Sequence, residues 1–494
     1  MKIHCSNLGP DFEKIIADAI QNLQPVADAG VAVAVVKDGQ LAFAGGFGLR
    51  DRASGAEVDA STCFAIGSAT KAFTSMAISM HVEQGKIALD APIQQLLPGF
   101  QMKDPQASSQ ATLLDILCHR TGLAPHNSLW YLGPFTRSQL LYRLRYLDPV
   151  PIPGGTAFRT KFIYNNIMYM IAGHLLEILF GVKYEDIIKT RILEPLQMTS
   201  TTLTLAKLTG GSNYAKGYER ANELPLKDFS NIGPAAEINS NVLDMAKWLQ
   251  LFLRKGLSSN GSVLVTQPDL ERMYAPFMST DDGTGTSYGL GWTIGAIQSG
   301  QQNKRIVFHT GDADGNSAYV SFMPDDGLAV VVLTNQHCTP DLINIWPDKV
   351  ATDIYDHLLH NQLTGQIRLP PRAVAAAVPA APGAASVAAL AAAPAVAATV
   401  ASPGDYMGMF SDPGYGDMVV SRAGNDLNIS YYGWSWPLQP LSLSPTAFRF
   451  DVFGFGSDFP VFVQYAQGST GSLDSFTASM VLQPVVLLVP FLKR

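Results

Sequence analysis

The sequence predicts an α/β domain followed by a small all-β domain. Helix-like and strand-like hydrophobic periods alternate up to about residue 369. Residues 370–403 are almost wholly Ala, Val, Pro and Gly, with Arg372 as their only charge, a composition typical of a linker. Short strand-like segments separated by Gly, Pro, Asn and Ser follow. We therefore expect a first domain at 1–369, a linker at 370–403 and a second domain at 404–494.

The first domain begins with a pattern typical of one helix packed on an antiparallel hairpin. Residues 11–23 have the spacing of an amphipathic helix, and strand-like runs at 31–36 and 40–45 flank the turn Lys37-Asp38-Gly39. The same criteria predict helices at 71–84 and 166–179, and strands at 306–309, 318–323 and 328–333. The last two strands share a short turn, so they are expected to form a second hairpin.

The second domain is expected to be a small barrel or sandwich. Its short strands include residues 418–421, 427–431 and 447–453. The longest late apolar run, residues 481–492, is interrupted by a glutamine and two prolines. Since it is well short of the ~20 residues that span a bilayer, we predict a buried strand and no membrane span.

Composition argues against several classes of function. The 494 residues carry 41 acidic and 34 basic side chains, a net charge of −7, and lack the basic excess that nucleic-acid binding requires. The cysteines have no zinc-type spacing, and Gly45-Gly46-Phe47-Gly48 lacks the G-x-G-x-x-G pattern of a phosphate-binding loop. We expect no metal, nucleotide or flavin cofactor. Because residues 1–17 lack the apolar stretch of a secretory signal, we expect a cytoplasmic location.

Ser68 and Lys71 form the first candidate pair for catalysis. They lie where an apolar segment meets a helical pattern, so Ser68 would open a helix with Lys71 one turn behind it on the same face. A lysine amine can take a hydroxyl proton if burial or nearby positive charge lowers its pKa. On its own, S-x-x-K is also compatible with a capping serine beside a surface lysine.

Two later segments add polar side chains suited to the same chemistry. Tyr164 and Asn166 are alternate residues before a predicted helix, and alternation places them on one side of an extended chain. His309 and Thr310 end a predicted strand, where Gly311 lets a substrate approach the backbone closely. Taken separately, Tyr164 is also compatible with a core aromatic, and His309 with a hydrogen-bonded strand histidine.

In this order and at these separations, the three segments resemble the motifs of the serine β-lactamase and penicillin-binding-protein superfamily. Tyr164-x-Asn166 is similar to the Y-x-N form of the class C branch. The segments His119-Arg120-Thr121-Gly122-Leu123 and Tyr288-Gly289-Leu290-Gly291-Trp292 resemble the family too. The resemblance covers about residues 10–360 and implies a helical subdomain beside an antiparallel sheet flanked by helices. The segment from Tyr406 resembles the lipocalin-like domain that some members carry.

The resemblance also implies roles for the first two motifs. Ser68 would attack an acyl carbonyl and form an ester. Lys71 and Tyr164 would share the proton handling. Asn166 would hold the amide of the substrate or the lysine.

The third motif is implied to bind the reacting carbonyl. Thr310 and Gly311 would line the substrate, and the oxyanion would lie between the backbone N–H groups of Ser68 and Asp312. His309 stands where β-lactamases commonly have a lysine, which resembles the esterase, D-aminopeptidase and peptide-cyclase branches. A positive charge there would depend on pH, because an unperturbed imidazole titrates near 6.5.

Asp312 departs from the small residue that many relatives have at its position, and Asp314 follows close behind. Both can lie in a solvated turn. Alternatively, one carboxylate holds His309 protonated or pairs with a cationic group of the substrate.

The leading expectation is a serine hydrolase that forms an acyl-enzyme from an ester or amide of a small or peptidic substrate. The first alternative is an acyltransferase or a penicillin-binding-protein-type thioesterase that releases and cyclises a carrier-bound or thioester nonribosomal peptide. The second alternative is a binding protein without catalysis. The β-domain is expected to cap the cleft, and the sequence leaves the oligomeric state open.

Overall fold

A computed structural model describes residues 3–4, 8, 12–21, 29–280, 283–299, 302–337, 347–360, 406–424, 426–440, 447–454, 457–467, 473–482 and 485–493. The chain folds into two compact units. The first comprises residues 1–97, 112–119 and 168–373, and the second comprises residues 98–111, 120–167 and 374–494. The expected linker at 370–403 lies outside the described residues.

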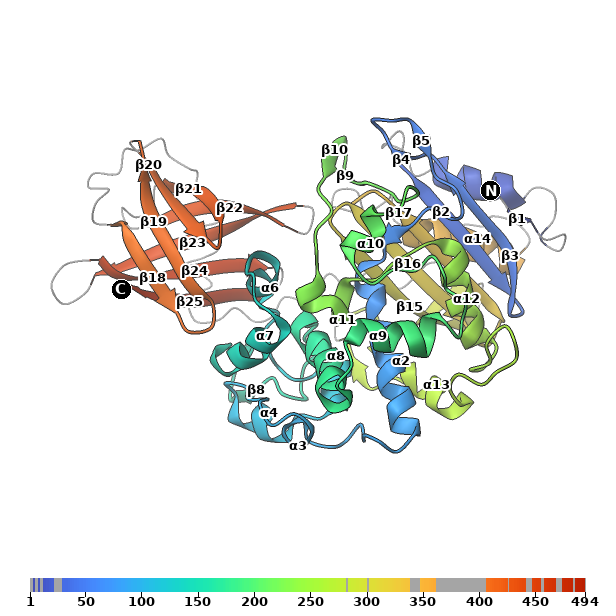
Figure 1. The fold of residues 1–494 in the computed structure, drawn as a ribbon, viewed down its shortest axis with the longest axis horizontal. Helices are drawn as coiled ribbons and strands as arrows, with labels where there is room; N and C mark the ends of the chain where they lie inside the picture. Colours follow the sequence, from blue (N-terminus) through green and yellow to red (C-terminus); the bar gives the residue numbers. More distant parts are fainter. Residues whose placement is uncertain are drawn as a thin grey trace. The chain divides into compact units, whose positions relative to one another are not determined.

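The described part of the first unit contains a nine-stranded sheet with the order β1-β3-β2-β17-β16-β15-β14-β13-β12 (Figure 1). The hairpin of β2 (Val31–Lys37) and β3 (Gln40–Phe47) joins the hairpin of β16 (Asn316–Met323) and β17 (Leu328–Thr334) through antiparallel pairing of β2 with β17. Both predicted hairpins are confirmed. The other strands are β1 (Ile3–His4), β12 (Met278–Ser279), β13 (Ser287–Tyr288), β14 (Thr293–Ser299) and β15 (Gln302–Ala313).

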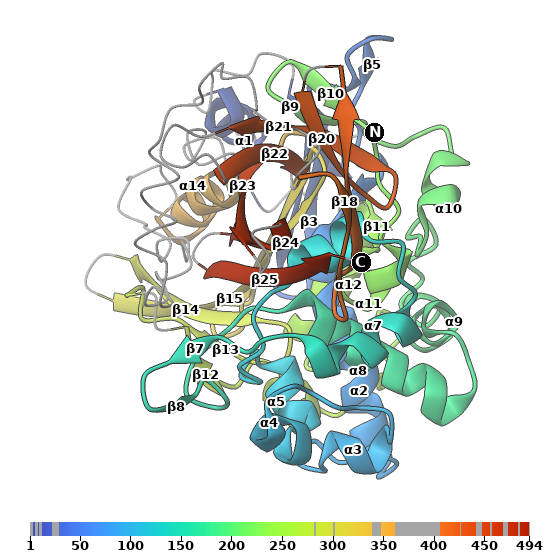
Figure 2. The same ribbon diagram turned by 90° about the vertical axis from the view of Figure 1, so that its left-hand side faces the viewer.

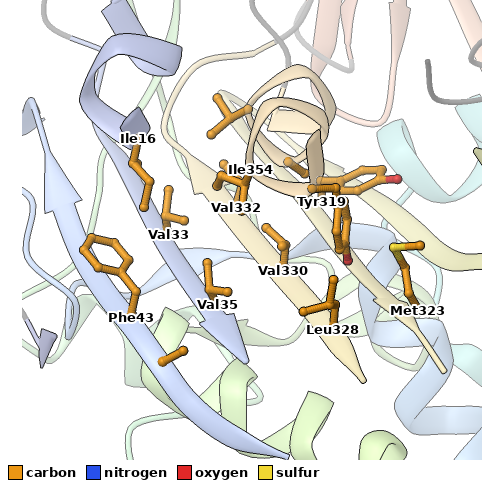
Figure 3. Close-up of a cluster of buried hydrophobic side chains, with 14 of the residues drawn as sticks. Ile16, Val33, Val35, Phe43, Tyr319, Met323, Leu328, Val330, Val332 and Ile354 are labelled. Carbon is orange, nitrogen blue, oxygen red and sulfur yellow. The ribbon is translucent and has the colours of Figure 1, made fainter. Parts of the chain in front are cut away.

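One face of this sheet packs on α1 (Phe12–Gln21) and α14 (Pro347–His360). Every second residue of the central strands β2 and β17 points to this face and is buried there: Val31, Val33 and Val35 on β2, and Leu328, Val330 and Val332 on β17. Figure 3 shows the resulting cluster, with Ile16, Val33, Val35, Phe43, Tyr319, Met323, Leu328, Val330, Val332 and Ile354 labelled. The predicted first helix is therefore confirmed, and its apolar side is part of the main core.

The opposite face of the sheet packs on α12 (Val242–Leu253), where Phe252 meets Phe322 of β16 with ring centroids 4.9 Å apart. Coverage of both faces explains why β16 and β17 are buried along their whole length and lack a polar alternation.

The predicted helices at 71–84 and 166–179 are present as α2 (Thr70–Glu83) and α8 (Asn166–Phe180). The boundary between the two units falls inside α8, after its second residue. Shorter elements of the first unit are β4 (Leu49–Asp51), β5 (Ala56–Glu57), β6 (Phe64–Ala65), η1 (Gly67–Ala69), α3 (Ile93–Leu96), α5 (Leu113–Leu117), α9 (Tyr184–Ile188), η3 (Lys189–Leu193), α10 (Leu205–Thr209), β9 (Gly217–Glu219), β10 (Asn222–Leu224), η4 (Ser230–Ile232), α11 (Gly233–Ala236), β11 (Asn239–Ser240) and α13 (Gln267–Met273).

No single helix within the described ranges has both the length and the apolar composition needed to cross a membrane. Among the described helices, the pair 166–180 and 184–193, bent by 87°, meets that test together by length and composition alone.

The second unit contains the helices α4 (Pro105–Gln110), α6 (Asn127–Leu132) and α7 (Arg137–Arg143), with η2 (Leu144–Tyr146), β7 (Pro151–Ile152) and β8 (Gly155–Thr156). Two of these helices have side-chain caps. The Asp104 carboxylate accepts hydrogen bonds from the first backbone N–H groups of α4, and Thr136 and Gln139 form a capping box at the start of α7. These caps explain how helices of only six or seven residues are stabilised.

The second unit also contains a closed antiparallel barrel, drawn in orange and red in Figure 2. It closes where β18 pairs with β25, so the barrel alternative is confirmed over the sandwich. The single strand expected at 481–492 is wrong, because β24 ends at Leu482 and β25 begins at Val485, on either side of Pro484. The strands are β18 (Gly408–Asp412), β19 (Gly416–Ala423), β20 (Asp426–Tyr431), β21 (Trp434–Pro440), β22 (Ala447–Gly454), β23 (Ser457–Gln467), β24 (Leu473–Leu482) and β25 (Val485–Lys493).

Candidate active site

The first unit brings Ser68 and Lys71 into direct contact. Ser68 lies in the 3₁₀ turn η1 and Lys71 in the first turn of α2, so their three-residue spacing places both on one side. The Lys71 Nζ donates hydrogen bonds to Ser68 Oγ at 3.0 Å and to the carbonyl oxygen of Ala235 at 3.0 Å. Because the Lys71 side chain is fully buried, the surface-lysine alternative is excluded.

Burial lowers the pKa of Lys71 well below its ordinary value. The Nζ lies among a backbone carbonyl, the Ser68 hydroxyl and the face of Tyr169, whose ring centroid is 5.5 Å away. Loss of hydration on burial disfavours the charged ammonium relative to the neutral amine. A neutral amine has a lone pair that can accept the hydroxyl proton of Ser68.

His309 is buried on β15, and its hydrogen bonds suit a neutral ring. Its Nδ1–H donates to the Thr310 carbonyl at 2.6 Å, which leaves Nε2 to accept from the Tyr288 hydroxyl at 2.9 Å. Burial is the main cause that lowers the pKa of His309 to about 3. The expected titration near neutral pH is therefore corrected, because desolvation keeps this imidazole uncharged.

Three further aromatic side chains complete this buried cluster: His119, Tyr169 and Tyr288. The His119 ring lies with its centroid 5.1 Å from Tyr169 and 4.9 Å from Tyr288. Burial also lowers the pKa of His119 well below its ordinary value. His119 and Tyr288 belong to segments that carried the resemblance, but sequence reasoning did not name them as site residues. Tyr169 lies on an apolar helix, and nothing in its spacing distinguishes it from a core aromatic.

The backbone of the third motif lies directly against the turn that carries Ser68. A Cβ atom added to Gly67 would lie 2.5 Å from the backbone N and O of Asp312, and one added to Gly311 would lie 1.9 Å from the carbonyl oxygen of Ile66. Gly67 also has φ +50, which disfavours other residues. Both glycines are thus required for the close approach of η1 to β15.

Asp312 points its carboxylate at a different histidine from the one expected. Its Oδ1 lies 2.9 Å from Nδ1 of His337, and the Asp312 side chain keeps 40% of its surface exposed. Burial lowers the pKa of His337, but the carboxylates of Asp312, Glu219 and Asp314 together raise it above the ordinary value. The hypothesis that a carboxylate holds His309 protonated is therefore wrong, and the histidine that Asp312 pairs with is His337.

A pocket lies beside the same backbone segments. Its walls include Ala65 before η1, Ala236 next to the Ala235 carbonyl, and Ala313 next to Asp312. Burial lowers the pKa of Lys227 in its wall to about 8, although the charge of Asp314 opposes this. The remaining lining residues are Leu205, Leu208, Leu226, Phe229, Glu237 and Asn239. In the part of the chain that the structure describes, no three His, Cys, Asp or Glu side chains form a group able to hold a metal ion.

The other two predicted site residues, Tyr164 and Asn166, belong to the second unit. Tyr164 is half-buried just before α8, and Asn166 is the first residue of that helix. Asn165 between them is fully buried, and its Nδ2 donates to the carbonyl oxygens of Ala124 at 2.8 Å and Leu123 at 3.3 Å. The side-chain amide between the two motif residues thus anchors the segment to a neighbouring loop.

A buried lysine in contact with a serine, on a helix beside an antiparallel sheet, is the arrangement expected of a serine nucleophile with a lysine base. Residues 19–352 match the sequence model of the family described as Beta-lactamase. The chain therefore belongs to the β-lactamase family, within the β-lactamase and penicillin-binding-protein superfamily, whose members are serine hydrolases.

Individual proteins of this superfamily are similar to this chain in sequence or in fold. An unguisins hydrolase of Aspergillus violaceofuscus is 30% identical over 364 residues, which cover 67% of this chain and 62% of that protein. This chain thus spans less than two thirds of the length of that relative. The octameric penicillin-binding protein homologue of Pyrococcus abyssi shares the fold over 98% of this chain and 99% of its own, with 19% identity and a TM-score of 0.58. A class C β-lactamase of Rhodobacter sphaeroides shares it over 70% of this chain and 99% of its own, with 23% identity and a TM-score of 0.58.

Proposed function

We propose that this chain is a serine hydrolase that forms an acyl-enzyme at Ser68 from an ester or amide of a small or peptidic substrate in the cytoplasm. The observation that carries the proposal is the 3.0 Å contact between Ser68 Oγ and the Nζ of the fully buried Lys71. Burial is the cause that lowers the pKa of this amine. A lowered pKa suits the amine to accept a proton rather than to remain a fixed cation.

In the first step, Ser68 Oγ attacks the acyl carbon of the substrate and forms the new C–O bond. The hydroxyl proton passes to the neutral amine of Lys71, with the Tyr164 hydroxyl sharing the transfer. The electron pair of the carbonyl moves to its oxygen, which becomes an oxyanion. Collapse of this intermediate breaks the bond to the leaving group, which takes the proton from Lys71.

We assign the oxyanion to the backbone N–H groups of Ser68 and Asp312. The close approach of Gly67 to the Asp312 backbone supports this assignment, since it brings the two peptide segments side by side. Removing one donor from such a site typically costs about 10²- to 10³-fold in rate. Asn166, Thr310 and Gly311 are assigned to holding the amide or acyl part of the substrate.

Hydrolysis is favoured over transfer because the relative with 30% identity is named a hydrolase. Water would then attack the acyl carbon with its proton taken by Lys71, the bond from the acyl carbon to Ser68 Oγ would break, and Ser68 Oγ would take the proton from Lys71. If an amine intercepts the acyl-enzyme instead, the same geometry serves an acyltransferase or a cyclising thioesterase. The pocket lined by Ala65, Ala236 and Ala313 is proposed to take part of the acyl group.

Labelling with a fluorophosphonate probe tests the proposal. We expect intact protein to gain one label on the peptide containing Ser68, Ser68→Ala to gain none, and Ser109→Ala, which changes an exposed serine of α4, to label normally. Equal labelling of wild type and Ser68→Ala, or no labelling of either, would contradict the proposal and favour a binding protein. Mass spectrometry of products from a p-nitrophenyl ester offered water or an amine then separates hydrolysis from transfer.

A further inference from the structure

Within the second unit, the barrel is joined to the helical segment by the turn between β18 and β19. Arg143 at the end of α7 donates hydrogen bonds from Nη1 to the carbonyl oxygens of Gly414 at 2.7 Å and Pro413 at 3.1 Å. The next residue of the turn, Tyr415, has its hydroxyl 2.7 Å from Nδ1 of His126. Each of these two rings is only 2% exposed, so the contact excludes solvent.

His126 is the central residue of this contact. Its Nε2–H donates to the carbonyl oxygen of Asp148 at 2.8 Å, so its Nδ1 is the acceptor for the Tyr415 hydroxyl. His126 has φ +44, an unfavourable left-handed conformation for a residue other than glycine. Such a conformation persists when surrounding contacts determine it, and here both ring nitrogens are engaged.

Hydrogen bonds continue from His126 to the second motif. The carbonyl oxygen of Asp148 that accepts from His126 also accepts from the N–H of Ala124 at 3.4 Å. The carbonyl oxygen of Ala124 in turn accepts from Nδ2 of Asn165 at 2.8 Å. Asn165 is the residue between Tyr164 and Asn166. The barrel is thus connected through four successive hydrogen bonds to the backbone that presents both motif side chains.

Apolar and cation–π contacts support the same joint. Tyr432 of the barrel packs edge-on against Phe135, with ring centroids 5.1 Å apart. The guanidinium of Arg143 lies 3.8 Å from the centroid of the same Phe135 ring. The Tyr432 contact and the Arg143 hydrogen bonds to the 413–415 turn attach the barrel to the helical segment without help from the Tyr415 hydroxyl, so removing that hydroxyl alone should leave the barrel attached.

We propose that the barrel is a positioning element for the second motif: Tyr415 and His126 set the loop 123–126, and through Asn165 that loop sets Tyr164 and Asn166. His126 and Tyr415 act through other residues and are not catalytic. This assigns the second domain a role in aligning the site, in addition to the capping of the cleft that the sequence predicts. The link to catalysis rests on the proposed function, whereas the link to the geometry of the motif does not.

Hydrogen exchange of the full-length protein tests the geometric link directly. Tyr415→Phe removes one hydroxyl, and we expect amides in peptides covering residues 160–168 to exchange at least about 10-fold faster than in wild type. Tyr142→Phe is the matched control, since it removes an exposed hydroxyl from α7 in the same unit, and it should leave this exchange unchanged. Unchanged exchange in Tyr415→Phe would overturn the proposal. Should Tyr415→Phe fail to fold, Arg143→Ala and His126→Gln carry the same expectation.

The rate of fluorophosphonate labelling at Ser68 tests the catalytic link. We expect Tyr415→Phe to label about 10-fold more slowly, with an altered pH profile, because Tyr164 shares the proton transfer. A purely structural role would instead lower the melting temperature and leave the profile of the folded fraction unchanged, which would overturn the catalytic link. If wild type itself is not labelled, the proposed function fails, while the exchange experiment still decides the positioning role.

Discussion

Lys71 and His337 are both buried basic side chains of the first unit, yet their surroundings change their pKa values in opposite directions. Desolvation lowers the pKa of Lys71, and no charged group is among its causes. Desolvation also lowers the pKa of His337, but Asp312 at 2.9 Å and two further carboxylates outweigh it and raise the pKa. The comparison shows that a nearby carboxylate, and not burial alone, decides whether a buried base keeps its proton.

The opposite pKa shifts suit Lys71 and His337 to different roles within the first unit. Lys71 is suited to accept a proton because its charged form is disfavoured, whereas the charged form of His337 is favoured relative to a free histidine. An effective pairing of Lys71 with a carboxylate would stabilise the ammonium and remove the base. The structure instead places the carboxylate of Asp312 on the side of β15 where it meets His337.

Replacing Lys71 with arginine should have the largest effect, because a guanidinium stays protonated and cannot accept the Ser68 proton. We expect Lys71→Arg to slow fluorophosphonate labelling by about 10³-fold, within the range for loss of a general base. Lys86→Arg on the surface, measured in parallel, should label as wild type does. If Lys71→Arg were labelled as fast as wild type, Lys71 would act as a cation, and its proposed difference from His337 would be contradicted.

Gly67→Ala should have the next largest effect, because the added Cβ would lie 2.5 Å from the Asp312 backbone. We expect labelling to slow by about 10²-fold, as when one oxyanion donor is displaced. Gly85→Ala is the matched control, since Gly85 also has a positive φ of 66 but nothing within 4 Å of its added Cβ. Both variants lose some thermal stability, so equal activities would refute a special role for the close approach.

Acid should destabilise the folded protein through its buried neutral histidines. Burial is the main cause that lowers the pKa of His126 to about 4 from 6.5, so the unfolded chain binds more protons between these values and stability falls as pH drops through that window. For this histidine alone the loss is on the order of 3 kcal/mol. Urea unfolding at pH 4 to 7 should show a shallower pH dependence in His126→Gln than in wild type. If the free energy of unfolding depended on pH equally in the two proteins, the lowered pKa of His126 in the folded state would be contradicted.

The smallest effect is expected from Asp312→Asn, which removes the principal carboxylate beside His337. A histidine with a raised folded pKa stabilises the protein at low pH, and this contribution is lost as pH rises above 6.5 through the folded pKa. The melting temperature of Asp312→Asn should therefore depend less on pH between 6 and 9 than that of wild type, and His337→Gln should behave alike. The acid limb of the pH profile of fluorophosphonate labelling should not move, since His309 forms its hydrogen bond with Tyr288, whereas Asp312 pairs with His337. A shift of that limb would restore the rejected pairing of Asp312 with His309.

Sequence reasoning found the side chains of the Ser68 and Lys71 pair because their contact is local. Positions three apart on a helix meet whatever the rest of the fold does. The pairing of Asp312 with His337 could not be found in this way, because it joins β15 to the segment that follows β17. The missed Tyr169 has the same explanation, since only the packing of α8 near α2 brings its ring to the lysine.

The two units show a second limit of sequence reasoning. The composition break at 370–403 suggested a division of the chain at one place, and the expected domains are continuous in sequence. The compact units instead combine the barrel with residues 98–111 and 120–167. Contacts such as Arg143 with the 413–415 turn depend on surface shape and hydrogen-bond geometry, which leave no periodic pattern in the chain.

By itself, the sequence determined the local structure: the hairpins, the main helices, the strands of a second β-domain and a serine one turn before a lysine. These follow from side-chain periodicity and turn chemistry, which act over a few residues. Only the tertiary structure decided which bases are neutral, since the pKa values of Lys71, His309 and His337 depend on burial and on partners distant in the chain. It also decided the contact of the barrel with the 123–126 loop, because long-range packing is a property of the assembled fold and not of any single segment.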